Sequence, residues 1–202
     1  MCKTEEDFYK ACRAGAILGT VQAGYTDFKF LSPTSKKIFD REALLGVSIT
    51  GWMNQPDILF NPKVLEKGAK IVKEVNKEVA AIIGINPAAR TTCVKPSGNA
   101  SVLLQTASGI HAEHSPMYIR NVQMNKESEV TQAIIKSNPY MAEESVWSAG
   151  GTDVVVSFPI IPHKGSMMKD DLLGVDHLEK VKLAQKLQIV TGKRHYDIST
   201  TS

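Results

Sequence analysis

The chain has 202 residues, of which 43% are hydrophobic and 22% are charged, proportions typical of a folded globular protein and not of a disordered one. Its net charge is only +3, with basic and acidic residues interspersed, which argues against a DNA- or RNA-binding surface. Three widely separated cysteines argue against a disulfide framework or a zinc knuckle, and a polar N-terminus without any apolar run of roughly 18 residues predicts a cytoplasmic chain that does not enter a membrane.

The N-terminal quarter of the chain predicts a helix, a loop and a buried strand. Thr4 is a candidate N-cap, because three acidic residues follow it in the first turn of a helix that we expect to run to about Ala23. A loop is expected at Ser32-Pro33-Thr34. The stretch Leu44 to Trp52 is apolar, partly β-branched and flanked by turn residues, as in a buried strand.

The middle of the chain predicts a long helix, then a strand and a short helix. Asn61-Pro62 opens the clearest helix, whose apolar residues recur at three- and four-residue spacing until Gly84 stops it. The β-branched segment Thr91 to Lys95 predicts a strand. A helix is expected from about Asn99 to Thr106.

Strands and helices continue to alternate in the second half. We expect strands at Tyr118 to Met124 and Thr152 to Ile161, and helices at Lys126 to Lys136 and along the apolar stripe from Leu178 to Val190. The polar tail Gly192 to Ser202 is expected to add at most a short strand. This alternation favours an α/β architecture with a mainly parallel sheet, in which ligands meet the carboxyl ends of the strands.

The motif KPSGNAS connects a predicted strand to a predicted helix. Pro96 and Gly98 predict a tight turn, and free amides from Gly98 to Ser101 would face outward at the helix start, where they bind anions. The hydroxyls of Ser97 and Ser101 would add hydrogen bonds. The motif matches neither the Walker A nor the GxGxxG pattern, and an ordinary turn with a serine cap explains the spacing equally well.

The segment SGIHAEHSP raises a second question of chemistry. His111, Glu113 and His114 have the residue types of a metal site, but no helix is expected across this segment and no further ligand is evident. A structural loop with surface histidines is the alternative, and either histidine could donate a proton near neutral pH.

The cysteines Cys12 and Cys93 lie within a predicted helix and a predicted strand. Both have apolar or β-branched neighbours. We therefore expect buried, inert thiols and not nucleophiles.

Three segments together carry a resemblance to a known family. ALLGVSITGWMNQP, TTCVKPSGNASVLLQTASGIHAEHSPMYIRNVQMNKE and NPYMAEESVWSAGGTD resemble the C-terminal half of the large catalytic chain of adenosylcobalamin-dependent (class II) ribonucleotide reductases, especially of the bacterial and phage type. The resemblance extends from about Lys3 to Val190. Each segment alone would be a weak signal, whereas the combination is specific.

The resemblance implies an α/β fold: about half of a ten-stranded barrel made of mainly parallel strands alternating with helices, with residues 1–202 as a single fragment of that domain. It implies that the substrate-binding loop at the nucleotide diphosphate comprises Pro96, Ser97, Gly98, Asn99, Ala100 and Ser101. It places Gly109, Ile110 and His111 on the active-site wall, and it implies no metal ligand in this chain.

The departures from the family pattern concern catalysis. The family's finger loop has the form Asn-x-Cys-x-Glu, and this motif is absent here. The reducing cysteine pair and most of the adenosylcobalamin surface are also expected in the missing N-terminal half, supplied in cis or in trans. We therefore expect a fragment that binds the ribonucleotide substrate but is inactive alone.

A non-catalytic module is the alternative function. It would keep the phosphate loop and bind nucleotides or a partner. Under either hypothesis half a barrel exposes an apolar sheet edge and inner face, which invites partner binding or self-association into a homo-oligomer.

Overall fold

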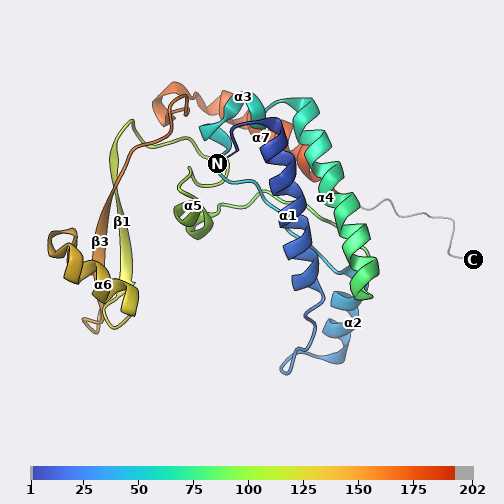
Figure 1. Ribbon diagram of the computed structural model, residues 1–202, viewed down its shortest axis with the longest axis horizontal. Coiled ribbons are helices and arrows are strands. Elements are labelled where there is room, and N and C mark those ends of the chain that lie inside the picture. The colour runs from blue at the N-terminus through green and yellow to red at the C-terminus, as the bar shows by residue number, and fades with distance from the viewer. Residues whose placement is uncertain (1, 194–202) are drawn as a thin grey trace, which may run out of the picture. The chain divides into compact units, whose positions relative to one another are not determined.

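The structure is a computed structural model that describes residues 2–193, apart from the side chain of Asn99 (Figure 1). The polar tail expected at residues 192–202 therefore lies almost entirely outside the described residues. The chain divides into two compact units. The first, here called the helical unit, contains residues up to 113 and from 164 onward. The second, the sheet unit, contains residues 114–163.

The helical unit is built from helices and extended connections. Its elements are α1 (Glu5–Ala23), α2 (Pro33–Glu42), η1 (Trp52–Asn54), α3 (Pro56–Leu59), α4 (Pro62–Ile83), α5 (Gly98–Leu104), η3 (Lys169–Asp171), α7 (Gly174–Ala184) and the π-helical turn η4 (Gln185–Ile189). The helices predicted from Thr4, from Asn61-Pro62 and from the last apolar stripe are therefore confirmed.

Two of these helices begin and end where the sequence predicts. The Thr4 hydroxyl accepts a hydrogen bond from the Asp7 amide, and the Asp7 carboxylate accepts one from the Thr4 amide, both at 3.1 Å, which completes a capping box. The amide oxygen of Asn61 caps α4 at 3.0 Å. Gly84 ends α4 in the left-handed region, with φ of 76°.

The core of the helical unit lies between α1 and α4, which run side by side (Figure 1). Phe8 and Cys12 of α1 pack with Leu65 and Val72 of α4, and Trp52 is fully buried in the same cluster. Gly68 lets the two helices approach, since a Cβ atom at this position would lie 2.5 Å from the Phe8 ring.

The strand predicted at Leu44 to Trp52 is an extended segment with a single parallel bridge, between Val47 and Thr92. The amides of Leu45 and Val47 donate to the carbonyls of Arg90 and Thr91, each at 3.0 Å. Two extended segments paired along so short a length form few hydrogen bonds. The predicted parallel orientation is confirmed at this bridge, but a regular parallel sheet is not formed.

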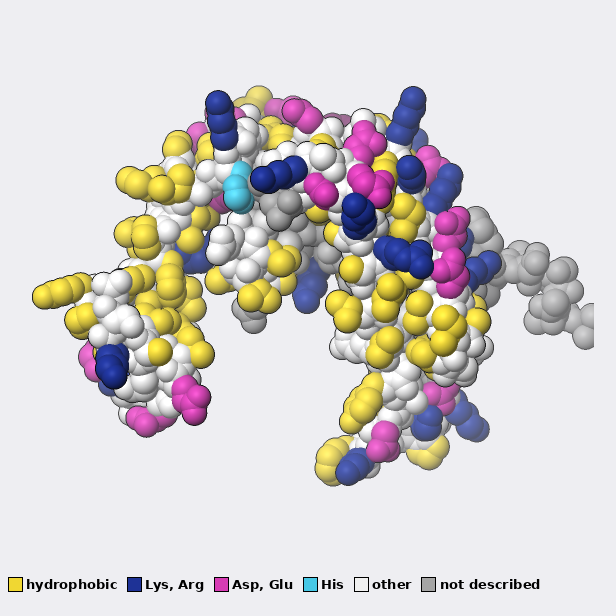
Figure 2. All heavy atoms as spheres, viewed as in Figure 1, with side chains coloured by type: hydrophobic (Ala, Val, Ile, Leu, Met, Phe, Trp, Pro, Cys, Tyr) yellow, Lys and Arg dark blue, Asp and Glu magenta, His cyan; other side chains and the backbone are white. Residues whose placement is uncertain are grey.

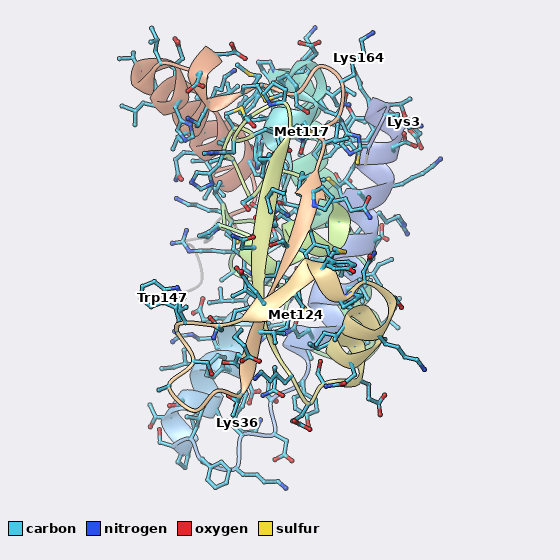
Figure 3. All side chains as sticks on the ribbon, turned by 90° about the vertical axis from the view of Figure 1, so that its left-hand side faces the viewer. Lys3, Lys36, Met117, Met124, Trp147 and Lys164 are labelled. Carbon is cyan, nitrogen blue, oxygen red and sulfur yellow. The ribbon has the colours of Figure 1, made fainter. Side chains whose placement is uncertain are left out.

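The sheet unit contains β1 (Tyr118–Asn125), α6 (Glu129–Ser137), η2 (Pro139–Met141), β2 (Ala142–Glu144) and β3 (Asp153–Ile160). The strand order is β1-β3-β2, and both pairings are antiparallel, with Tyr118 opposite Ile160 and Asn125 opposite Asp153. In Figure 3, β1 extends from near Met117 to Met124. The predicted strands at 118–124 and 152–161 are confirmed.

The prediction of a mainly parallel sheet is wrong for this unit. Because β1 and β2 are each antiparallel to β3, they point the same way, and α6 connects them as a strand-helix-strand pattern would require. The third strand, β3, lies between them. Alternation along the chain therefore predicted β1 and β3 as parallel strands, whereas they are antiparallel, and β2 was not predicted.

Two α-helices, α2 and the short α3, were not predicted. The loop expected at Ser32-Pro33-Thr34 is the start of α2, where the Ser32 hydroxyl accepts a hydrogen bond from Ser35 at 3.2 Å and proline occupies the first helical position. The helix has no buried residue, so it has no regular apolar stripe to reveal it. None of the helices formed by residues 2–193 is long and apolar enough to cross a membrane.

Candidate functional site

The loop Pro96 to Ser101 turns sharply into α5. The turn is made by Ser97, which adopts a left-handed conformation with φ of 55° and ψ of 39°, and not by Gly98, the first residue of the helix. No side chain caps this helix start. Pro96, Gly98 and Ala100 are exposed, and apart from its chain neighbours and its own helix backbone no atom of the described chain lies within 4 Å of where a Cβ of Gly98 would be. The outer side of the loop is therefore open.

The two serines of the loop face inward. The Ser101 hydroxyl donates to the carbonyl of Gly98 at 3.1 Å and lies 3.0 Å from the Ser108 hydroxyl, while the Ser101 amide donates to the carbonyl of Ser97 at 3.0 Å. Ser97 is also buried. The expectation that both hydroxyls face a ligand is therefore not met. These serines hold the shape of the loop and leave the backbone of Gly98 and Ala100 at its surface.

Gly109 brings the second predicted segment directly against this loop. Its φ is +50°, and a Cβ atom added there would lie 2.5 Å from the carbonyl oxygen of Lys95 and 3.1 Å from that of Pro96. A side chain cannot occupy that space without a shift of the loop backbone. The two segments singled out in the sequence, around Pro96 and around Gly109, thus form one structural site.

Thr50 and Asn54 hold the Gly109 segment in place, and the sequence analysis missed both. The Thr50 hydroxyl donates to the carbonyl of Ala107 at 3.0 Å and accepts from the amide of Gly109 at 3.1 Å. The Asn54 side-chain oxygen accepts from the amide of Ala107 at 2.7 Å. The signal was available, since polar residues at the carboxyl end of an apolar segment commonly position a site.

The acid and histidines of SGIHAEHSP do not converge. The Glu113 carboxylate is buried and accepts a hydrogen bond of 2.7 Å from the side-chain amide of Asn54. His111 is exposed, and its Nδ1 lies 3.0 Å from the carbonyl of Ser108. His114 belongs to the sheet unit. Across the part of the chain that the structure describes, no group of three or more His, Cys, Asp or Glu side chains is placed to hold a metal ion.

The remaining predicted site residues divide between surface and interior. Ile110 is buried in the core of the helical unit, while His111 stacks obliquely near His177, with 6.1 Å between ring centroids. Ile110 therefore belongs to the core and presents no side chain to a ligand. His111 is the member of Gly109, Ile110 and His111 that exposes a side chain beside the loop.

The thiols of Cys93 and Cys12 are not activated as nucleophiles, because their pKa values are raised. Burial raises the pKa of the Cys93 thiol, and its sulfur donates to the carbonyl of Gly46 at 3.3 Å. Burial also raises the pKa of Cys12 to about 12. A thiol with a raised pKa has little thiolate near neutral pH. The prediction that neither cysteine is an activated nucleophile agrees with this environment.

Comparison with known proteins gives a coherent result. No family model matches the chain. The chain is 27% identical over 187 residues to a probable adenosylcobalamin-dependent ribonucleoside-triphosphate reductase from Dictyostelium discoideum, a match that covers 90% of this chain and 24% of the relative. It is 25% identical over 129 residues to the adenosylcobalamin-dependent ribonucleoside-triphosphate reductase of Euglena gracilis, covering 62% of this chain and 17% of that protein.

The resemblance predicted from the sequence is confirmed. The fold also matches that of a solved B12-dependent, class II ribonucleotide reductase, with a TM-score of 0.69 and 16% identity, over 88% of this chain and 29% of that one. The chain thus spans about a quarter of the Dictyostelium reductase. The mixed α/β character expected for a reductase fragment is confirmed by the same fold match.

Proposed function

We propose that this chain is part of an adenosylcobalamin-dependent ribonucleotide reductase, an oxidoreductase that converts ribonucleotides to deoxyribonucleotides by radical chemistry. The observation that carries the proposal is the 27% identity over 187 residues to one reductase, and the fold is compatible with it, with a TM-score of 0.69 to another. In this proposal the chain contributes about half of the family's ten-stranded barrel.

The loop Pro96 to Ser101 is the proposed phosphate-binding element. Its outer side is open, its helix start is uncapped, and the space beside Gly98 is empty of protein atoms. The backbone amides of Gly98 and Ala100 are the donors we assign to the substrate phosphates, since backbone N–H groups bind phosphate without a charged side chain. Ser97, Ser101 and the close approach of Gly109 fix the shape of the loop.

The remaining catalytic groups are assigned to the rest of the enzyme. The sequence has no Asn-x-Cys-x-Glu motif, so the radical-bearing cysteine has to come from a segment outside these 202 residues, in cis or in trans. The chain alone is therefore expected to bind substrate without reducing it. His111 is the side chain of this chain that we place on the active-site wall.

Three cavities of the described chain are small compared with adenosylcobalamin. They have volumes of about 730, 340 and 300 Å³ and lie along α1 and the segment that follows it. None of these is large enough to enclose a corrin ring with its axial and nucleotide groups. We assign no residue of this chain to the cofactor, which in the proposed enzyme supplies the initiating radical when it is bound by the remaining part.

A graft tests the proposal. The segment of the Dictyostelium reductase that matches this chain is replaced by residues 1–202, and formation of deoxynucleotide is measured with adenosylcobalamin. We expect activity in the graft and none with the isolated chain. An inactive graft that folds, combined with tight nucleotide binding by the isolated chain, would support the non-catalytic module instead.

The phosphate assignment has its own matched control. Gly98 and Gly174 are each the first residue of a helix, and at both positions an added Cβ meets no described atom within 4 Å. Gly98→Val fills the open space of the loop, so we expect it to raise the KM for the ribonucleotide in the graft at least tenfold. Gly174→Val should leave KM unchanged. Equal effects of the two variants would contradict the phosphate-binding role.

A further inference from the structure

A second cavity lies in the helical unit, separate from the open side of the Pro96 to Ser101 loop. Its volume is about 340 Å³. Phe8 and Cys12 of α1 form one wall, Thr50 and Leu59 another, and Thr106 and Gln188 complete it. Every residue that lines the cavity is uncharged. A phosphate group would find no cation there, so this cavity differs in chemistry from the proposed substrate site.

Two polar atoms in the wall of this cavity have no hydrogen-bond partner within the described chain. They are Oγ1 of Thr106 and Oε1 of Gln188, in residues that are only 8% and 1% exposed. Buried polar atoms are almost always paired in native proteins, and an unpaired one is costly. The Gln188 oxygen can only accept a hydrogen bond, so its partner has to be a donor, which an occupant of the adjoining cavity can supply.

The position of Gln188 strengthens this reading. It lies in η4, the π-helical turn that follows α7. Such turns are uncommon and occur often at functional sites, because the widened turn redirects a side chain. The neighbouring wall stays uncharged, since burial raises the pKa of the Cys12 thiol to about 12. The cavity therefore combines an apolar lining with one fixed acceptor.

We propose that this cavity binds a small uncharged molecule with an apolar body and a single hydroxyl or N–H group that donates to Gln188 Oε1. The volume lies within the range of cavities that bind small molecules, and an apolar lining with few polar groups is the usual composition of such sites. The unpaired Thr106 hydroxyl is a second polar group in the cavity wall that can donate to an oxygen of the ligand. The inference does not depend on the proposed reductase activity.

A matched pair of probes tests the proposal with the full chain. The probes are 2-naphthol, which has an apolar body and one hydroxyl, and 2-methylnaphthalene, in which a methyl group replaces that hydroxyl. Binding is measured by titration of probe fluorescence and by the shift in Tm. We expect 2-naphthol to bind and to raise Tm, and 2-methylnaphthalene to bind roughly tenfold more weakly, the effect of one lost hydrogen bond.

Variants at two glutamines of the same turn locate the binding. Gln188→Leu removes the unpaired acceptor, so we expect it to raise the Tm of the free protein and to abolish the tenfold preference for 2-naphthol. Gln185→Leu, at an exposed position of η4, should change neither. Thr106→Val serves as a second variant if Gln188→Leu does not fold, and it should also reduce the preference.

Several outcomes would overturn the proposal. If neither probe binds, ordered water satisfies the two polar atoms and the cavity is not a ligand site. Equal affinity for the two probes would show that Gln188 plays no part in recognition. Retention of the preference in Gln188→Leu would place any binding elsewhere in the molecule.

Discussion

The helical unit and the sheet unit differ in how they bury apolar side chains. In the helical unit, large side chains such as Trp52, Leu65 and Val72 are fully buried between helices. In the sheet unit the buried residues are small: Thr131, Ser145, Val154 and Val156. The residues of β1 alternate between half-buried and exposed, so that strand buries no side chain completely. The helical unit is therefore stabilised by large buried side chains, whereas the sheet unit buries only small ones.

The sheet unit also leaves several of its large apolar side chains exposed to solvent. Tyr140, Val146 and Trp147 are exposed, and Figure 3 shows Trp147 projecting away from the strands. The helical unit also exposes apolar residues along α1, including Leu18 and Val21, and Figure 2 shows hydrophobic side chains on its visible face. The helical unit has a core that compensates for this exposure. Hydrophobic burial in the sheet unit is far smaller, which predicts lower local stability.

The largest effect is expected from removal of the central side chain of the helical unit. Trp52 is fully buried, its ring packs against Phe60, and its indole N–H donates to the carbonyl of Ile49 at 3.0 Å. Trp52→Ala should lower the free energy of unfolding by about 3–5 kcal/mol. Urea unfolding measures this loss. Hydrogen exchange in the wild type should show stronger protection in α4 than in β1, and the reverse order would contradict the comparison.

A glycine pair gives the next largest effect. Gly109 and Gly151 both have positive φ, of +50° and +63°, but only Gly109 has backbone atoms where a Cβ would go. Gly109→Ala should destabilise the protein by about 2–4 kcal/mol, from backbone strain and overlap with Lys95. Gly151→Ala should cost about 1 kcal/mol, from strain alone. Thermal unfolding of the two variants measures the difference, and equal losses would show that the contact with Lys95 is unimportant.

Two apolar residues of the sheet unit, one buried and one exposed, test whether burial determines the loss of stability. Val156 of β3 is fully buried, whereas Trp147 is 84% exposed. Val156→Ala should lower the free energy of unfolding by about 2 kcal/mol, from lost burial and the cavity left behind. Trp147→Ala should leave it nearly unchanged, although it removes the larger side chain. A large loss for Trp147→Ala would mean that this residue is covered in solution.

The smallest effect concerns pH and the start of α1. The hydrogen bond from the Thr4 side chain and those from the backbone of Lys3 and Thr4 lower the pKa of the Asp7 carboxyl. A lowered pKa means that the carboxylate stabilises the fold above its unfolded pKa, and that this contribution is lost as pH falls through its folded pKa. Asp7→Asn should flatten the acid side of the stability curve, as measured by Tm between neutral and acidic pH. A curve of unchanged slope would contradict the capping role.

Much of the fold was predictable wherever a local signal determined the structure. The Thr4 cap, the Asn61-Pro62 start and the Gly84 stop are local features, and the helices between them lie where predicted. The position of β3 between β1 and β2 is not local, because strand pairing depends on residues far apart in the sequence. The helix α2 has no buried face and so gave no periodic signal.

The candidate site was predictable in its backbone and not in its side chains. The turn at Pro96 to Ser101 was recognised from residue types, although Ser97 and not Gly98 makes it, and Gly109 was assigned through the family resemblance. The inward direction of the Ser97 and Ser101 side chains was not, because a hydroxyl can bond either to its own loop or to a ligand, and only the tertiary partner Ser108 decides. Thr50 and Asn54 had a local signal, their place at the end of an apolar segment, but the groups that they hold could not be predicted, since their partners lie 53 to 59 residues away.

The contact between Phe8 and Gly68 has a consequence for how related chains diverge. A Cβ atom at position 68 would overlap the aromatic ring, so the two positions share one fixed volume. A larger residue at 68 is compatible with the same helix spacing only when residue 8 becomes smaller. Across homologues, side-chain size at these two positions should therefore vary inversely, which makes the pair a marker of whether a distant relative retains this helix arrangement.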